Sequence, residues 1–142
     1  LYCKKINVGE EEPRQIASGL RKHYPNIEDL QNRKVLVVCN LKSTNLVGFK
    51  SFGMVLCAVD SESGKTEIID PPADAKVGER VFVDGVSGNA LSSSQVKKKK
   101  AWRTLQPSLK TTEEALASWD GKVIQTSAGP CKAASLTGVQ IK

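Results

Sequence analysis

Two short apolar runs stand out in the pattern of hydrophobic and polar positions, one at residues 35–39 and one at residues 54–58. Each run is about as long as one β-strand and too short to cross a membrane, so both are predicted to form buried strands. The connection between them is polar and basic, and no Asp or Glu occurs between Asp29 and Asp60. The pattern therefore predicts a basic, carboxylate-free connection between two hydrophobic strands.

Further short segments predict strands on both sides of this pair. Residues 2–8 alternate between two faces, and the polar cluster at residues 60–65 has the composition of a hairpin loop. Pro71 and Pro72 end a strand, because neither can donate a hydrogen bond to a neighbour. The predicted strands are residues 2–8, 14–18, 35–39, 54–58, 66–69 and 80–83, and a short helical segment is predicted at residues 26–30.

The C-terminal part of the chain is predicted to form a second structural unit. Residues 85–94 are rich in Gly, Ser and Asn and are expected to be a linker or a long loop. Trp102 and Leu105 then share one face of a predicted helix, which Pro107 must end after Gln106.

A second helix is predicted directly afterwards. Thr111 and Glu114 have the spacing of a capping box, and Ala115, Leu116 and Trp119 would form the apolar side of that helix. Alternation returns at residues 123–126, 132–136 and 139–141. This part of the chain is therefore not expected to be a disordered tail.

The short strands of the first part, separated by Gly and Pro, predict a small all-β barrel. Strand spacing alone fits both an OB-fold and an SH3-like barrel.

Several motifs make the chain similar to one family. NLK at residues 40–42 is followed by Gly48 and then by S-x-G-M-x-L-x-A at residues 51–58; INVGEEEPRQIASGL, DPPADAKVGERVFV and KKKKAWRTLQP occupy residues 6–20, 70–83 and 97–107. Together they resemble the tRNA-binding OB-fold domain of the endothelial-monocyte-activating-polypeptide II type. That family includes modules of tyrosyl- and methionyl-tRNA synthetases and free-standing synthetase cofactors.

The resemblance implies an all-β domain with short helices, in which residues 1–85 form a five-stranded OB-fold barrel whose first strand is truncated. Residues 86–142 would form an α+β appendage that packs on the barrel and mimics a dimer interface made by simpler relatives. It also implies that Trp102 and Trp119 are packing residues and that the chain is a monomer.

The balance of charges agrees with a polyanionic partner. The chain has 142 residues, with 21 Lys and Arg against 15 Asp and Glu, and a pI of about 9.2. Its four cysteines form no C-x-x-C pair and there is one His, which excludes the usual zinc spacings and argues against a disulfide scaffold. Cys39 and Cys57 are expected to be small buried residues of the core. The protein is expected to be cytoplasmic, where thiols stay reduced, and no membrane partner is expected.

No reaction centre is evident in the sequence. His23, the only histidine, lies in a basic segment, and the sequence around Gly64 and Lys65 lacks the leading Gly of a phosphate-binding loop. We therefore expect no catalytic residue, no metal and no cofactor, although the domain can belong to a synthetase polypeptide.

The candidate RNA-binding residues around the central connection are Asn40, Lys42, Lys50, Ser51 and Met54. The lysines can neutralise phosphates, and Asn40 and Ser51 can bond to phosphate, 2′-hydroxyl or base edges. The resemblance places Ser51 and Met54 at positions that the family uses for tRNA, whereas the apolar run alone favours core packing for Met54.

A second basic site is predicted at Lys97, Lys98, Lys99, Lys100 and Arg103. No acid occurs between Asp84 and Glu113, so nearby carboxylates do not neutralise these charges. Four consecutive lysines on a helix point in different directions, and a solvated, solubilising run is the alternative.

The predicted function is non-catalytic binding of tRNA by shape and charge rather than by base sequence. The module would supply tRNA to a linked or associated aminoacyl-tRNA synthetase by raising its local concentration. Few aromatic residues lie near the connection, so base stacking is not expected to carry much of the affinity. The alternative is a protein-interaction or cytokine-like signalling module of the same family.

Overall fold

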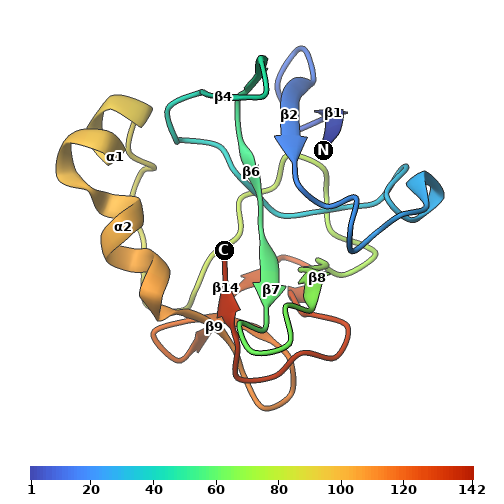
Figure 1. Cartoon of the computed structure of the whole chain (residues 1–142). Coiled ribbons are helices and arrows are strands. Elements are labelled where there is room, and N and C mark those ends of the chain that lie inside the picture. The colour runs from blue at the N-terminus through green and yellow to red at the C-terminus, as the bar shows by residue number, and fades with distance from the viewer.

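The computed structural model describes all of residues 1–142, and short strands make up most of its regular structure (Figure 1). The strands are β1 (Tyr2–Ile6), β2 (Arg14–Ser18), β3 (Val37–Val38), β4 (Thr44–Leu46), β5 (Phe49–Ser51), β6 (Met54–Val55), β7 (Cys57–Val59), β8 (Thr66–Ile68), β9 (Leu109–Thr111), β10 (Ala117–Trp119), β11 (Lys122–Val123), β12 (Gln125–Thr126), β13 (Gly129–Pro130) and β14 (Gln140–Ile141). The helices are α1 (Ser93–Lys99) and α2 (Ala101–Leu105), with 3-10 helices η1 (Ile27–Asp29) and η2 (Gln106–Ser108). A β-rich fold with short helices is thus confirmed.

The largest sheet joins segments that are far apart in the sequence. Its order is β11-β10-β9-β14-β7-β8, with all neighbours antiparallel, and the other strands form the ladders β1-β2, β3-β6, β4-β5 and β12-β13. No sheet closes on itself, so a closed five-stranded barrel remains a prediction. The six-stranded sheet takes strands from both residues 1–85 and residues 86–142. The division of the chain into a barrel and an appendage at residue 85 also stays a prediction.

The central apolar run is buried on both sides. Leu56 and Ala58 belong to a hydrophobic cluster of 11 buried residues, which also takes residues from β9, β10 and β14. Val55 and Cys57 belong to a separate cluster of five buried residues. Successive side chains of a strand point to opposite faces, so a strand between two cores needs apolar residues at every position.

The connection after residue 39 contains a hairpin where a loop was expected. β4 and β5 pair in register around a two-residue turn, in which Val47 has φ 52° and Gly48 has φ 79°. Positive φ at both positions is typical of a type I′ turn, which favours Asn-Gly or Asp-Gly. A β-branched residue is unusual there, so the sequence gives no hairpin signal at this turn.

The predicted second helix is wrong. Thr111 lies in β9 and Trp119 in β10, and these two strands pair as a hairpin. The hydroxyl of Thr112 accepts hydrogen bonds from the backbone N–H groups of Glu114 and Leu116, both at 3.2 Å. This threonine therefore folds a tight turn instead of starting a helix.

The first predicted helix is present but begins earlier than expected. Ser92 caps α1 through a capping box with Gln95, inside the segment expected to be a linker. Lys100, with φ 52°, separates α1 from α2, and α2 ends before Pro107 as predicted. Residues 80–83 form no strand; only Phe82 makes an isolated bridge, to Gln125.

The two cysteines that were expected in the core differ. Cys57 is buried, and burial raises the pKa of its thiol to about 11. Cys39 is exposed, contrary to expectation, and it directly follows the end of β3 at Val38. None of the helices has the length and apolar character needed to span a bilayer.

Candidate nucleic-acid interface

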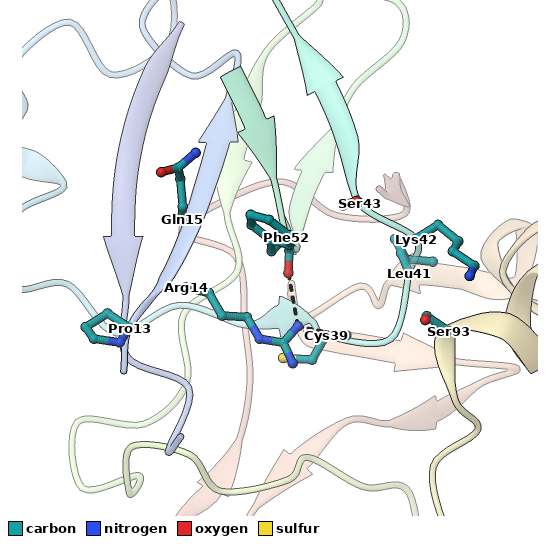
Figure 2. Close-up of a pocket in the computed structure, with 9 residues that line it drawn as sticks. All are labelled: Pro13, Arg14, Gln15, Cys39, Leu41, Lys42, Ser43, Phe52 and Ser93. Atoms are coloured by element: carbon teal, nitrogen blue, oxygen red, sulfur yellow. Dashed lines mark hydrogen bonds between the residues drawn. The ribbon is translucent and has the colours of Figure 1, made fainter. Parts of the chain in front are cut away.

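A shallow groove of about 680 Å³ runs between the start of β2, the segment after β3 and the start of α1 (Figure 2). We call it the basic groove. Its lining residues are Pro13, Arg14, Gln15, Cys39, Leu41, Lys42, Ser43, Phe52 and Ser93. No carboxylate is among them, as the acid-free connection in the sequence predicts.

Arg14 shapes one side of this groove. Its Nη1 donates to the backbone oxygens of Cys39, at 2.6 Å, and Phe52, at 3.0 Å, while Nε and Nη2 bond to the carboxylate of Glu10 at 2.7 and 2.8 Å. The hydrogen bond with Glu10 raises the pKa of Arg14, and the same bond lowers the pKa of Glu10. Arg14 thus joins three chain segments, and its donors are engaged within the protein.

Two of the predicted lysines lie in the open. Lys42 lines the groove, and its Nζ is 3.2 Å from the hydroxyl of Ser94 in α1. Lys50 is exposed on β5, and its Nζ is 5.4 Å from the ring centroid of Phe52. Lys42 therefore lies in the groove, and the ammonium group of Lys50 lies beside Phe52, another of its lining residues.

The other three central candidates are less accessible. Ser51 is only 2% exposed; its Oγ accepts from the N–H of Ala17 and donates to the oxygen of Gly53. Its burial does not support a direct contact with RNA, and it instead fastens β5 to β2. Asn40 donates to the oxygen of Leu91 at 3.0 Å, so its amide group braces the segment before α1. Met54 packs against the larger hydrophobic cluster, which agrees with the core alternative.

The basic run begins beside the groove and extends away from it. Ser93 lines the groove, and Lys97, Lys98, Lys99, Lys100 and Arg103 are all exposed. Val96 is buried and fixes the rotation of α1. Residues four apart share a face of a helix, so Lys97 lies on the side of Ser93 and Lys98 on the side of Ser94. The structure thus brings the first two lysines towards the groove more than the last two.

A family described as "Putative tRNA binding domain" matches residues 1–80 of the chain. The chain belongs to this family. The family resemblance seen in the sequence is therefore confirmed. The family is described by what it binds, tRNA, and not by a catalysed reaction.

This tRNA-binding domain matches parts of larger proteins. The chain is 43% identical over its whole length to the probable methionine–tRNA ligase of Oryza sativa subsp. japonica, and it spans 18% of that protein. It is 37% identical to the mouse aminoacyl tRNA synthase complex-interacting multifunctional protein 1, again over its whole length, and spans 45% of that protein. The crystal structure of the C-terminal domain of Plasmodium vivax p43 matches with a TM-score of 0.86 and 38% identity, covering 99% of this chain and 84% of that one.

Of the nine residues that line the groove of this tRNA-binding domain, only Lys42 was among the predicted RNA-binding residues, and Gln15 and Ser93 show why others were missed. Gln15 comes from β2, and nothing in the local sequence connects it with residues 39–43. Ser93 could have been found, because Ser92 and Gln95 have the spacing of a capping box that starts a helix next to the basic run.

Proposed function

We propose that the basic groove holds the ribose-phosphate backbone of tRNA and that the domain binds tRNA without catalysing a reaction. The observation that carries this proposal is a groove without carboxylates, with Lys42 on its wall and Lys50 beside it, in a chain of the tRNA-binding family. Phosphate contacts of this kind give affinity that depends on charge and shape more than on base sequence.

The lysines of α1 would extend this surface. Six residue steps of 1.5 Å place the end of α1 about 9 Å from Ser93, a distance that one or two further phosphates can bridge. In this proposal Lys97, Lys98 and Arg103 add to the contacts, and Asn40, Ser51 and Met54 support the groove from behind.

The setting proposed for the domain is a cytoplasmic, monomeric module with an OB-type barrel, linked to or associated with an aminoacyl-tRNA synthetase. The names of the rice and mouse relatives support such a setting, because one is a ligase and the other interacts with a synthetase complex. Tethering raises the local tRNA concentration at the catalytic domain without any new contact to it.

The proposal is tested by titrating unfractionated tRNA into the wild-type domain and the K42Q/K50Q variant at several salt concentrations. Each lost phosphate contact should reduce the slope of log affinity against log salt by roughly one, and affinity near physiological salt should fall about tenfold. The matched control is K110Q/K142Q, which removes the same charge from a second surface hollow that shares no residue with the basic groove, and it should leave affinity unchanged. A flat salt dependence of the wild type, or an equal loss in both variants, would refute the groove proposal.

Cysteine alkylation gives an independent readout on the same complex. Cys39 lines the groove, and Cys3 is exposed on β1 away from it. Bound tRNA should slow alkylation of Cys39 and leave that of Cys3 unchanged. A domain that recovers a synthetase but binds no tRNA would favour the protein-interaction alternative.

A further inference from the structure

Phe52 is an aromatic residue at the surface with a fixed backbone. Its side chain is 41% exposed, and it lies between β5 and β6. Its N–H donates to the oxygen of Gln15 at 2.9 Å, and its oxygen accepts from Arg14 at 3.0 Å. The segment is therefore held from both sides, and the exposed ring does not belong to a free loop.

The next residue explains why the ring stays outside. A Cβ atom at Gly53 would lie 2.9 Å from Cδ1 of Ile16 and 3.1 Å from Cγ1 of Val37, so the chain passes too close to the core for a side chain there. This close packing leaves no room for a side chain on the core side at residue 53, and the neighbouring Phe52 side chain is partly exposed among the residues that line the groove.

The groove offers the ring a set of polar neighbours. Figure 2 shows Phe52 between Gln15 on one side and Leu41 and Lys42 on the other, and Lys50 places its ammonium group 5.4 Å from the ring centroid. The ammonium group of Lys50 lies over one face of the ring, so a base that stacks on the other face would have a lysine near its phosphate.

From these observations we propose that Phe52 is the stacking platform for one unpaired base of the bound RNA. This inference rests on the proposed function and specifies the ligand class of the same groove. A backbone held by phosphate contacts alone needs no aromatic face, whereas base–aromatic stacking tolerates any base and would add a contribution that the few aromatic residues in the sequence did not lead us to expect. A base inside a duplex already stacks on its neighbours, so the ligand must offer a loop or an end at this point.

The test compares wild type with F52A, F52L and F52Y, using unfractionated tRNA, a single-stranded RNA and a duplex RNA of the same length. F52A and F52L should lose roughly tenfold in affinity for tRNA and single strands, while F52Y should bind as the wild type does. The salt slope should not change, because no phosphate contact is lost. Leu keeps the apolar bulk of the side chain but has no aromatic face, so F52L separates stacking from shape.

The outcomes distinguish this inference from the function on which it rests. A wild-type domain that binds no RNA overturns both. Normal tRNA binding by F52L, or an equal loss on duplex and single-stranded RNA, overturns only the stacking role. If F52A loses both tRNA binding and melting temperature while F52L keeps both, the role of Phe52 is in folding. If RNA affinity is unaffected and capture of a purified synthetase fails in F52A, the ring belongs to a protein interface instead.

Discussion

The domain has two surface hollows of almost the same size and very different chemistry. The basic groove measures about 680 Å³, and a second hollow of about 620 Å³ lies between the loop after β7, Lys110 on β9 and residues 135–142. Asp60 and Glu62 share the second hollow with Lys110 and Lys142, so its charges offset one another, whereas the basic groove has no acid. The two hollows therefore differ in the charge of their lining residues and not in their volume.

The second hollow also has a wall that is stabilised from inside the protein. Glu67 is buried behind it and accepts hydrogen bonds from the N–H of Ser135 at 2.9 Å, the hydroxyl of Ser135 at 2.7 Å and the N–H of Leu136 at 2.7 Å. Burial by itself would raise the pKa of Glu67, but these bonds and the nearby Lys65 outweigh it and lower the pKa. This part of the surface is thus organised for stability.

The largest expected effect comes from removing that buried charge. E67Q should lower the free energy of unfolding by about 3 kcal/mol at pH 7, because hydrogen bonds to a charged group are strong and an amide cannot accept all three donors. Since the folded pKa of Glu67 is depressed, its contribution is complete above the unfolded pKa of about 4.3 and is lost as pH falls through the folded value. Urea unfolding between pH 7 and pH 3 should show that the difference in unfolding free energy between wild type and E67Q becomes smaller as the pH falls. A difference in unfolding free energy that does not change with pH would contradict this role of the carboxylate.

A smaller loss of stability should come from Ser51, which holds β5 to β2. S51A removes the acceptor of the Ala17 N–H and leaves that buried donor without a partner, which costs about 1 to 3 kcal/mol. The affinity of the folded variant for tRNA should stay at the wild-type value if Ser51 only holds β5 to β2. S43A, at the exposed rim, is the control and should change stability by less than about 0.5 kcal/mol. A reduced tRNA affinity in a fully folded S51A, with the salt slope unchanged, would show that Ser51 contacts the ligand.

The smallest expected effect concerns the lysines of the basic run. K97Q/K98Q should weaken tRNA binding about fivefold, because these side chains share the helix faces of Ser93 and Ser94. K99Q/K100Q removes the same charge from the other faces and should reduce affinity less than twofold. Equal losses in the two variants, measured at the same salt, would mean that net charge rather than position determines binding.

The sequence was most informative where neighbouring residues determine the structure. The strand at Arg14–Ser18 and the hairpin around residues 60–65 were predicted correctly, since alternation and turn residues are local signals. The β4–β5 hairpin was missed because Val47 occupies a turn position that usually carries Asn or Asp. The supposed helix after Thr111 was wrong because a stripe of three apolar residues is too short to separate a helical period from a strand period.

The sequence predicted the charge of the candidate site but not its geometry. The acid-free connection pointed to Lys42 and Lys50, and both are exposed. Contacts across the fold decide the rest: Gln15 reaches the groove from β2, and Ser51 is covered by the same strand. Such pairings join residues that are more than twenty positions apart, so no local pattern carries them.

The position of β14 has a consequence for how this domain is made. β14 lies between β9 and β7, and the backbones of Lys142 and Cys57 exchange hydrogen bonds of 2.9 and 3.1 Å. A ribosome delivers Cys57 long before Lys142, so the nascent chain carries β7 with one edge unpaired until the last part of this sequence has emerged. An open strand edge readily pairs with other polypeptides, and pairing between distant segments is slow. Newly made copies should therefore need protection by chaperones during translation, even though the finished sheet leaves that edge covered.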